Sequence, residues 1–482
     1  MYINIIGYGV TNQAIVTLLN HKNIKCHIYD DKYECDNRDE KGNIYRPLKN
    51  VEMLYKAKPN GEDGEENLAI ISPGIPPNTP FLSYFKNIVS EYDFIFNIAK
   101  GLYSIWISGT NGKTTTTEMT ACMLEAKSGG NIGIPLATLF MQDFYNDSTI
   151  SNILYNQSML IQKYKENNQV YEICTLQDSK ALWVLETSSF TLHYTYYALP
   201  NIYILLPLSQ DHISWHGSFE SYIIDKLKPL KFINYANNQK QHYALIPKEL
   251  MKYKVTKDII ETTQANLFLY EDSKELYKYL QCDKKYFEHF KEPFRLDFML
   301  AASSIHFANI PFCIENILEY KIGAHRMEEH KQNNILFVND SKATNPHAVL
   351  SALNTYKDYA IYLILGGDSK GAEMDMLYPF LQTHLVKVFS IGKDGGSIAK
   401  DCMVNNIWIK ECMTLDSAMQ NIKTQLYKDY DIQSNSSPDS IKTHLKAPVV
   451  MLSPACASLD QYTSYKQRGD RFNELTKLIF VI

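Results

Sequence analysis

Short runs of apolar residues alternate with segments of helical periodicity along most of the chain. In the first part, a segment with apolar residues at helical spacing, Thr11–Leu19, separates two short strands. A third strand is closed by the turn Ser72-Pro73-Gly74, and the charged, glycine-containing segment 31–64 predicts a loop. This order is typical of a dinucleotide-binding type of domain, ending near residue 92. The strands predicted here are Tyr2–Ile6, Lys25–Tyr29 and Leu68–Ile71.

Two further parts of the chain repeat this alternation of strands and helices. We therefore predict an α/β fold of three domains, at residues 1–92, 93–322 and 323–482. Two stretches, 145–180 and 428–446, are rich in polar residues and tyrosine, and we expect them to be peripheral insertions. The strands predicted in the second and third domains are Tyr103–Ser108, Ala181–Leu185, Asn201–Leu206, Ile335–Val338, Tyr359–Leu365, Val386–Ile391 and Val449–Leu452.

The composition narrows the class of protein. With 482 residues, 45% of them hydrophobic, the chain can build a buried core in each domain. Its 48 basic and 53 acidic residues give a net charge of -5 with no single-sign block, so no nucleic-acid partner is expected. The nine cysteines form no CxxC pair and no zinc-site spacing, which favours reduced thiols and a cytoplasmic location. No apolar run approaches the roughly 18 residues that cross a bilayer, so no membrane insertion is expected.

The strongest chemical signal is the sequence GTNGKTT, which lies between a predicted strand and a predicted helix. Backbone N–H groups of such a loop point at phosphate oxygens, a lysine reaches the β- and γ-phosphates, and a threonine hydroxyl meets Mg²⁺. Ile107 occupies the first glycine position of the general GxxxxGK[ST] pattern, so this is a variant loop. The flanking strand and helix favour an ATP site over a chance turn. The residues expected at ATP are Gly109, Thr110, Asn111, Gly112, Lys113, Thr114 and Thr115.

Three more side chains of the central domain are candidates for chemistry. Glu186 follows a predicted strand, where α/β proteins place ligand sites, so it could bind Mg²⁺; taken alone, a surface glutamate is the commoner interpretation. His212 could bind a metal or position an acyl group. Lys226 lies four residues after Tyr222 on a helix expected from about Ser218. A lysine there usually extends to solvent, whereas a buried neutral lysine can take up CO₂ to form a carbamate whose oxygens suit Mg²⁺.

Polar clusters also follow the strands of the last domain. Arg326 could hold a phosphoryl group through its guanidinium. The sequences DSKATN (340–345), GGDSK (366–370) and SPACASLD (453–460) each follow a predicted strand, which places them at one edge of a sheet. Any one could be turn chemistry alone, but three together favour a ligand site. Cys456 has no identifiable base beside it and is interpreted as a small buried thiol without a catalytic role.

Taken together, these motifs resemble those of the Mur ligases of peptidoglycan synthesis, from Gly7 to Gly469. The sequences SKATN, GGDSK and SPACASLDQ favour the family member that adds D-glutamate. The motifs that carry the resemblance are GTNGKTT (109–115), NIGIP (131–135), ETSSF (186–190), DH (211–212), Lys226, HRME (325–328), DSKATN (340–345), GGDSK (366–370) and SPACASLDQ (453–461).

The resemblance implies an N-terminal Rossmann-like domain for the uridine nucleotide, a central P-loop ATPase domain and a C-terminal Rossmann-like domain for the incoming amino acid. It implies an ATP-dependent carbon–nitrogen ligase that adds D-glutamate to UDP-N-acetylmuramoyl-L-alanine through an acyl phosphate. Two Mg²⁺ ions and a CO₂-derived carbamate on Lys226 would assist, and we expect a monomer.

Residue roles are carried over from the family by motif. Three positions depart from its pattern: Phe294–Phe298 lacks the His-Asn pair usual near adenine, Asp31-Lys32 replaces Thr-Arg, and Tyr465 replaces Phe. The catalytic residues implied are Lys113, His212, Lys226 and Arg326. Those at ATP include Arg326 and Asp340, and those at metal are Thr114, Glu186, His212 and Lys226 as carbamate. The nucleotide substrate would contact Thr11, Asp30, Ser72, Asn131 and His212, and D-glutamate would contact Thr344, Lys370, Ser458 and Tyr465, with Lys342 beside it.

Three other interpretations stay open. Another Mur ligase or a folylpolyglutamate synthase would share the P-loop and the lysine. An NAD-dependent oxidoreductase is supported by Gly7-Tyr8-Gly9 and by Asp30, 21 positions after Gly9, but Asn12 takes the third-glycine position. A nucleotide-binding regulator without ligase activity would not need the metal and acyl-site residues.

Overall fold

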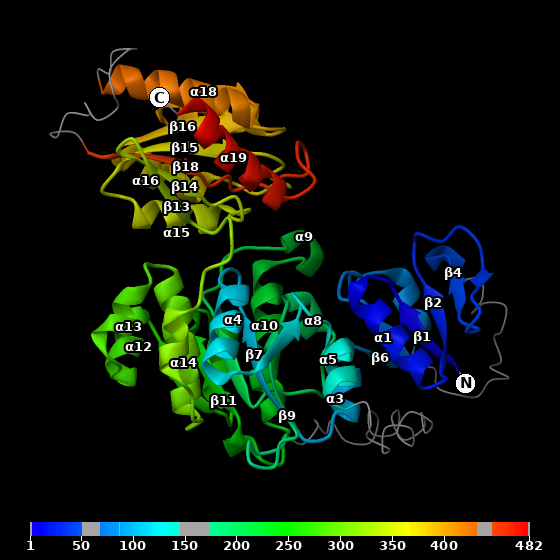
Figure 1. Ribbon diagram of the computed structural model, residues 1–482. Coiled ribbons are helices and arrows are strands. Elements are labelled where there is room, and N and C mark those ends of the chain that lie inside the picture. The colour runs from blue at the N-terminus through cyan, green and yellow to red at the C-terminus, as the bar shows by residue number, and fades with distance from the viewer. Residues whose placement is uncertain (1, 51–67, 86, 145–172, 431–445, 481–482) are drawn as a thin grey trace. The chain divides into compact units, whose positions relative to one another are not determined.

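The computed structural model describes residues 2–50, 68–85, 87–144, 173–430 and 446–480. Within these ranges the chain forms three six-stranded sheets. Two compact units contain them: residues 1–290 with 294–320, and residues 291–293 with 321–482 (Figure 1). The first unit holds two sheets and the second holds one. The expected insertions 145–180 and 428–446 lie largely outside the described residues.

The first sheet is built by the N-terminal segment, in the strand order β3-β4-β2-β1-β5-β6. The three predicted strands are confirmed as β1, β2 and β5. The prediction of a loop over 31–64 is wrong in part, because β3 and β4 lie in it. Their residues are exposed or half-buried at the sheet edge, so no apolar run marks them. The elements are β1 (Tyr2–Ile6), α1 (Val10–His21), β2 (Lys25–Tyr29), β3 (Asn37–Arg38), β4 (Ile44–Arg46), η1 (Leu48–Asn50), β5 (Leu68–Ile71), η2 (Pro80–Tyr84), β6 (Asn87–Val89) and α3 (Glu91–Ile98).

The second sheet is entirely parallel, in the order β12-β11-β10-β7-β9-β8. All seven residues of its strand β7 are buried, as expected for a strand covered on both faces. The elements are β7 (Leu102–Ser108), α4 (Lys113–Leu124), β8 (Lys127–Gly130), α5 (Leu136–Asp143), β9 (Ala181–Glu186), α8 (Ser189–His193), β10 (Ile202–Leu205), α9 (Ile213–His216), α10 (Phe219–Ile233), η3 (Gln239–Gln241), β11 (Tyr243–Pro247), η4 (Lys248–Lys252), α11 (Lys254–Thr262), β12 (Asn266–Tyr270), α12 (Ser273–Leu280), α13 (Lys284–His289), α14 (Phe294–Phe307) and η5 (Ile314–Leu318).

One apolar cluster joins these two sheets. It contains Ile3 and Ile5 of β1, Phe94 of α3, Trp106 of β7 and Leu185 of β9. All eight residues of α3 are buried, so this helix belongs to the shared core rather than to a linker. The first two predicted domains therefore fold against each other, and the boundary between them stays a prediction.

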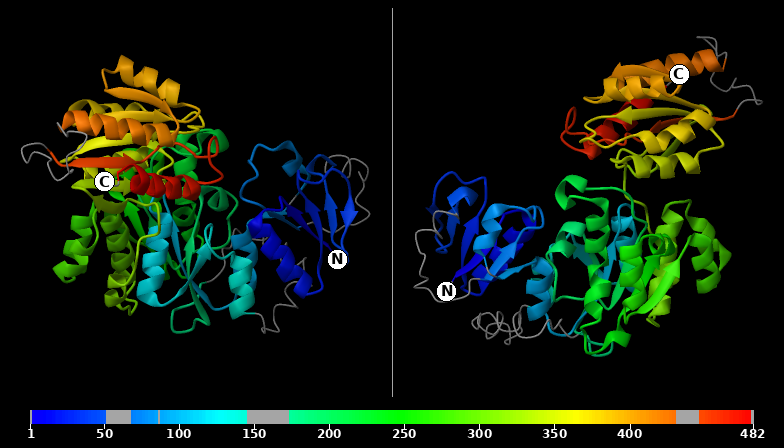
Figure 2. Two further views of the ribbon diagram at one scale, coloured as in Figure 1. Left: turned by 45° about the horizontal axis from the view of Figure 1, so that its top comes forward. Right: turned by 180° about the vertical axis from the view of Figure 1, so that it is seen from behind.

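The third sheet has the order β13-β14-β18-β15-β16-β17, in which β13 alone of its described strands runs antiparallel to its neighbour. Ile361, Leu363 and Leu365 of β15 enter one apolar cluster, and Tyr362 and Ile364 enter another. Helices therefore cover both faces of this sheet (Figure 2). The elements are β13 (Glu328–Gln332), β14 (Ile335–Asn339), α15 (Pro346–Thr355), β15 (Ala360–Gly366), η6 (Asp375–Leu377), α16 (Tyr378–Thr383), β16 (Val386–Ile391), α17 (Gly395–Val404), β17 (Ile409–Met413), α18 (Leu415–Asp429), β18 (Pro448–Leu452) and α19 (Tyr465–Ile479).

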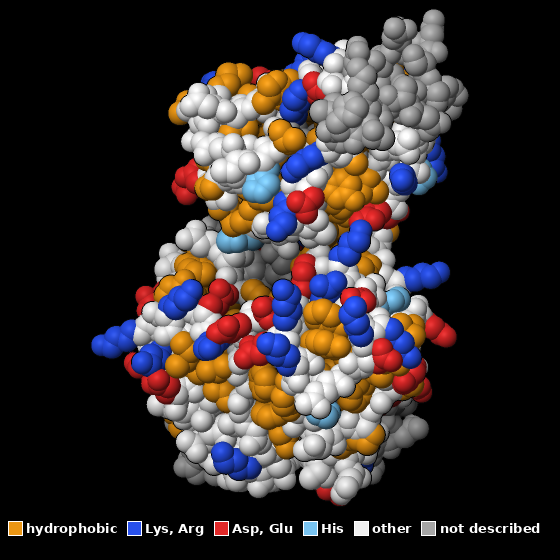
Figure 3. Space-filling view, turned by 90° about the vertical axis from the view of Figure 1, so that its left-hand side faces the viewer, with side chains coloured by type: hydrophobic (Ala, Val, Ile, Leu, Met, Phe, Trp, Pro, Cys, Tyr) orange, Lys and Arg blue, Asp and Glu red, His pale blue; other side chains and the backbone are white. Residues whose placement is uncertain are grey.

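The surface shows no single-sign field on the face drawn in Figure 3, where basic and acidic side chains are intermingled. In the described ranges, no helix has both the length and the apolar character to span a bilayer.

Candidate functional site

The predicted ATP loop connects β7 to α4 in a tight turn. Gly109 and Gly112 have φ angles of 151° and 81°, in a region that side chains disfavour. A Cβ on Gly112 would also lie 2.3 Å from an oxygen of Asp297, on α14. Lys113 begins α4, and its Nζ donates to the carbonyls of Gly109 (3.0 Å) and Thr110 (2.8 Å). The lysine thus lies against its own loop, beside the helix N-terminus where phosphates bind.

Glu186, at the end of β9, connects three predicted site residues. It is 1% exposed, and its two carboxylate oxygens accept hydrogen bonds from Thr114 Oγ1 (2.8 Å) and Asn131 Nδ2 (2.9 Å). Tyr92 Oη also donates to the Glu186 carbonyl (3.0 Å), a contact that the sequence did not indicate. The interpretation of Glu186 as a surface residue is therefore wrong. Its carboxylate and the Thr114 hydroxyl are oxygen donors of the kind that Mg²⁺ prefers.

Lys226 lies on α10, which begins after Ser218 as predicted. It is 1% exposed rather than extended to solvent, and its Nζ donates to Ser108 Oγ and to the Gly109 carbonyl, both at 3.0 Å. Burial, reinforced by the positive charge of Lys113, lowers the pKa of Lys226 well below its usual range. A neutral amine is the form that reacts with CO₂, so the environment suits the predicted carbamate.

His212 precedes the short helix α9, in a left-handed backbone conformation with φ of 54°. Although its side chain is 49% exposed, the surrounding protein lowers its pKa through desolvation, opposed by Asp211 and reinforced by Lys113 and Lys226. A lowered pKa favours the neutral imidazole, which is the form that binds a metal. Lys113 and Lys226 both donate to the Gly109 carbonyl, so these two predicted catalytic residues lie together, and their positive charges act on His212.

In the part of the chain that the structure describes, no three His, Cys, Asp or Glu side chains are grouped as a metal site. A Mg²⁺ ion at Glu186 would thus draw its other oxygens from Thr114, water, nucleotide phosphates and a carbamate. Magnesium commonly binds in this way, through one or two carboxylates and substrate phosphates. The residues present therefore fit the ion.

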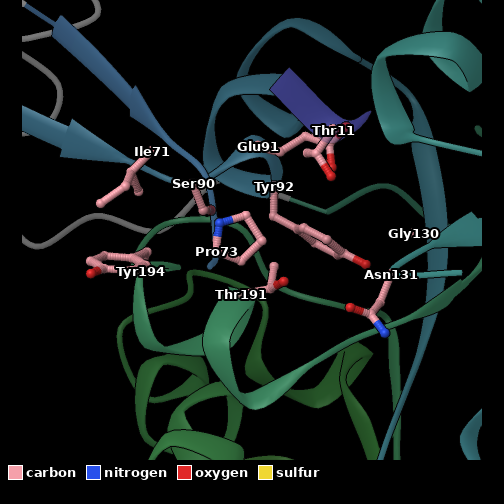
Figure 4. A pocket seen from close by; sticks show the side chains of 10 residues that line it. All are labelled: Thr11, Ile71, Pro73, Ser90, Glu91, Tyr92, Gly130, Asn131, Thr191 and Tyr194. Carbon is pink, nitrogen blue, oxygen red and sulfur yellow. The ribbon is translucent and has the colours of Figure 1, made fainter. Parts of the chain in front are cut away.

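A small cavity lies between the N-terminal segment and β8 (Figure 4). Thr11 of α1, Pro73 and Asn131 line it, together with Ile71, Ser90, Glu91, Tyr92, Gly130, Thr191 and Tyr194. Its volume of about 40 Å³ holds a few water molecules. It therefore brings two of the predicted nucleotide-substrate residues, Thr11 and Asn131, to one place without being large enough for the whole substrate.

Hydrogen bonds from Asn12 and to Asp30 stabilise the turn after β1. Asn12, at the third-glycine position, donates its amide to the carbonyls of Gly7 (2.7 Å) and Ile6 (3.2 Å). Asp30 accepts from the backbone N–H groups of Tyr8 (2.5 Å) and Lys32 (3.1 Å). Ser72 N donates to the Ile6 carbonyl (2.7 Å), so Asp30 and Ser72 both lie at this turn.

Aromatic residues that the sequence did not single out connect the two sheets of the first unit. Tyr194 Oη, after α8, donates to the Ile75 carbonyl (2.8 Å) next to Ser72-Pro73-Gly74. Trp215 of α9 packs against the apolar cluster of the first sheet, and its ring centroid lies 4.6 Å from that of Phe190. The segments that carry Glu186 and His212 thus contact the first sheet.

The second unit carries the rest of the predicted site. Asp340, after β14, accepts from Met327 N (3.2 Å) and from Ser453 Oγ (2.8 Å), after β18. Burial raises the pKa of Asp340 to about 7, opposed by these hydrogen bonds and by Arg326. Arg326 and Asp340 therefore lie together, and their contact with ATP stays a prediction.

The residues predicted for D-glutamate follow three neighbouring strands, β14, β18 and β15. Lys342 Nζ lies 4.2 Å from the ring centroid of Tyr465. Paired backbone hydrogen bonds between Asp368 and Ala457 bring the loops of Lys370 and Ser458 side by side. Thr344 is exposed in the loop after β14. The prediction that these sequences share one edge of a sheet is confirmed.

Arg468 of α19 holds two of these loops together, and the sequence did not indicate it. It is 1% exposed and donates to Ser341 Oγ (3.0 Å) and to the carbonyls of Ser341 (3.0 Å) and Cys456 (3.1 Å). Burial raises the pKa of the Cys456 thiol to about 12. A thiol that stays protonated is a poor nucleophile, in agreement with the structural role expected for Cys456.

Glu91, which lines the small cavity, predicts a pH dependence of stability. It is 5% exposed, and burial raises its pKa from 4.5 to about 8, opposed by the backbone N–H groups of Ala137 and Leu136. The folded state therefore holds this proton more tightly than the unfolded state. The stability from protonated Glu91 is fully present below about pH 4.5 and is lost as the pH rises through 8, at up to about 1.4 kcal/mol per pH unit.

The variant Glu91→Gln should remove this contribution to the pH dependence of the unfolding free energy. Chemical denaturation of both proteins from pH 5 to pH 8 should show the wild type losing stability relative to the variant as the pH rises. Glu249→Gln, an exposed glutamate of the same unit, is the control. If the unfolding free energies of the wild type and Glu91→Gln change equally with pH, the raised pKa of Glu91 is contradicted.

Comparisons with known proteins assign the family. Residues 107–318 match the Mur ligase middle domain. The chain is 36% identical to a UDP-N-acetylmuramoylalanine--D-glutamate ligase of Campylobacter jejuni (strain 81-176), over 99% of this chain and 100% of that protein. It is 33% identical to the ligase of the same name from Helicobacter pylori (strain HPAG1), over 98% of each chain. Among solved structures, it is similar to MurF ligase from Thermotoga maritima in complex with ADP, with 13% identity and a TM-score of 0.48. The match covers 95% of this chain and 96% of that chain. Identities of 36% and 33% over nearly the full length of these two relatives show that the chain belongs to the Mur ligase family and is an ATP-dependent ligase.

Proposed function

We propose that the chain joins D-glutamate to UDP-N-acetylmuramoyl-L-alanine through an acyl phosphate formed from ATP. The observation that carries this proposal is the hydrogen-bonded series Thr114–Glu186–Asn131, which links the P-loop to the cavity beside the first sheet. It supports a reaction in which a group bound near Asn131 meets the γ-phosphate. The names of the full-length relatives supply the substrates.

The first step activates a carboxylate, which repels nucleophiles and has no leaving group. Transfer of the γ-phosphoryl group to the L-alanyl carboxylate would supply one. Lys113, at the N-terminus of α4, would stabilise the phosphoryl oxygens, and Arg326 would add a second positive charge. Thr114, Glu186, His212 and carbamylated Lys226 would hold two Mg²⁺ ions, which supply charge neutralisation at the transferred group.

The second step forms the amide. The amine of D-glutamate, held through its carboxylates by Lys370 and Ser458, would attack the acyl carbon and expel phosphate. Thr344, Tyr465 and Lys342 belong to the same edge of the third sheet and would complete this pocket. Lys342, over the Tyr465 ring, supplies a further positive charge for a dicarboxylate.

Phosphate release from ATP tests the proposal. Purified protein with UDP-N-acetylmuramoyl-L-alanine should release phosphate with D-glutamate and much less with L-glutamate, L-alanine or meso-diaminopimelate. Release that needs both the nucleotide and D-glutamate supports the proposal. Release with another amino acid, or with a folate in place of the nucleotide, would instead assign the chain to a sister ligase.

We also propose that the protein acts in the cytoplasm as a monomer. The nine free cysteines support the cytoplasmic location, because reducing compartments keep thiols unpaired. Light scattering after gel filtration should give a mass near 55.5 kDa, whereas about twice that mass would indicate a dimer.

A further inference from the structure

A buried cluster of polar side chains lies on α8, α9 and α10. One carboxylate oxygen of Asp225 accepts from His193 Nδ1 (2.9 Å) and from His216 Nδ1 (3.0 Å). The other ring nitrogen of His216 lies 2.9 Å from Ser189 Oγ. Asp225 is 8% exposed, Ser189 is 3% exposed, and the side chain of His216 is fully buried. The cluster is therefore a preorganised network rather than a surface contact.

Three of the four residues in this network lie close in sequence to a residue of the proposed metal site. Ser189 follows Glu186 by three positions, and His216 follows His212 by four. Asp225 immediately precedes Lys226. The network thus connects the three segments that carry the carboxylate, the imidazole and the lysine.

Hydrogen bonds hold the ring of His216 at both of its nitrogens. A carboxylate can only accept, so Nδ1 donates to Asp225, and Nε2 lies within hydrogen-bond distance of the Ser189 hydroxyl. Ser189 is the first residue of α8, so this bond fixes the start of the helix directly after Glu186. Removing the Asp225 carboxylate would release both histidines at once.

We propose that Asp225 is a positioning residue of the ligase site, acting through His216 and Ser189 on the segments of Glu186, His212 and Lys226. The kinetic part of its test rests on the proposed function. Replacing a residue that orients metal ligands without binding the metal itself typically lowers activity by about 10- to 100-fold.

The same geometry could suggest a nucleophile, because Ser189, His216 and Asp225 are connected in the order of a Ser–His–Asp triad. A nucleophilic serine must reach a substrate carbonyl, and Ser189 is 3% exposed. The burial of the hydroxyl favours positioning. Covalent labelling of Ser189 by a fluorophosphonate probe would overturn this interpretation.

The test compares Asp225→Asn with Glu220→Gln, which changes an exposed acid on the same helix. Asparagine keeps the size of aspartate but carries no negative charge, so its single oxygen is a weaker acceptor for the two histidines that share one oxygen of Asp225. In the phosphate-release assay, kcat of Asp225→Asn should fall by about 10- to 100-fold while the KM for ATP stays within about twofold. Glu220→Gln should match the wild type in both constants.

Hydrogen exchange provides a readout that needs no turnover. In the full-length protein without substrates, Asp225→Asn should exchange faster than the wild type in residues 187–193 and 212–217, and no faster in the P-loop strand. If Asp225→Asn does not fold, Ser189→Ala should show the same kcat loss, to a smaller extent.

Unchanged kcat and unchanged exchange in Asp225→Asn would overturn the inference. A fall in kcat matched by an equal loss of folded protein would also overturn it, in favour of a purely structural role. If the wild type releases no phosphate with D-glutamate, the proposed function fails, and the exchange experiment still decides the role of Asp225.

Discussion

Replacing Lys113 with alanine should lower ATP-dependent phosphate release by roughly 1,000-fold or more, the loss expected when a preorganised charge at a transferring phosphoryl group is removed. The lysine Nζ donates hydrogen bonds to the carbonyls of Gly109 and Thr110, so it is already beside the expected phosphate position. Such a loss corresponds to about 4 kcal/mol of transition-state stabilisation. Steady-state kinetics with saturating nucleotide and D-glutamate would measure it.

The matched control is Lys240→Ala, an exposed lysine in the same unit. It should keep wild-type kinetics. Lys113→Ala should also unfold close to the wild-type temperature, because the hydrogen bonds from its Nζ to Gly109 and Thr110 lie within one loop. More than a tenth of the wild-type rate in Lys113→Ala would count against the assigned phosphate site.

The variant Lys226→Met should lose a similar factor in rate and almost nothing in stability. Methionine retains most of the side-chain length but cannot form a carbamate. Two hydrogen bonds are lost, to Ser108 and Gly109, but the cost of burying an amine is also removed. We therefore expect a change in unfolding free energy within about 1 kcal/mol.

Carbon-13 NMR with labelled bicarbonate tests the carbamate directly. The wild type should show a lysine carbamate signal that is absent from Lys226→Met. Lys228→Met is a close control, because burial also lowers the pKa of Lys228, to about 8, two positions further along α10. A carbamate signal that survives in Lys226→Met would locate the group elsewhere.

The family resemblance drawn from the motifs is confirmed by the full-length relatives, and the ligase interpretation therefore replaces the oxidoreductase and regulator alternatives. The strands β1, β2 and β16 have the predicted bounds, because each is a run of mainly apolar residues between polar turns. The interior strand β11 was not predicted although its residues are mostly buried, and several edge strands were also missed. β8 has the sequence KSGG and β13 has EEHKQ, and neither contains an apolar residue that periodicity could detect.

The burial of the site residues could not be predicted from the sequence either. The helix that carries Lys226 was predicted, but its burial depends on where β7 lies against α10. Ser189, His216 and Asp225 are separated along the chain, and only tertiary packing connects them. Residues of this kind can be found from a sequence only when a motif already marks them.

The position of Trp215 gives the protein an optical signal of its own. This indole lies against the apolar cluster of the first sheet and beside Phe190, on the helix that follows His212. Of the four tryptophans, Trp106 and Trp183 are fully buried and Trp408 belongs to the second unit. Indole emission responds to changes in its immediate surroundings, so occupancy at either sheet of the first unit should alter the fluorescence of Trp215. Stopped-flow fluorescence can therefore follow substrate binding to this unit without a label.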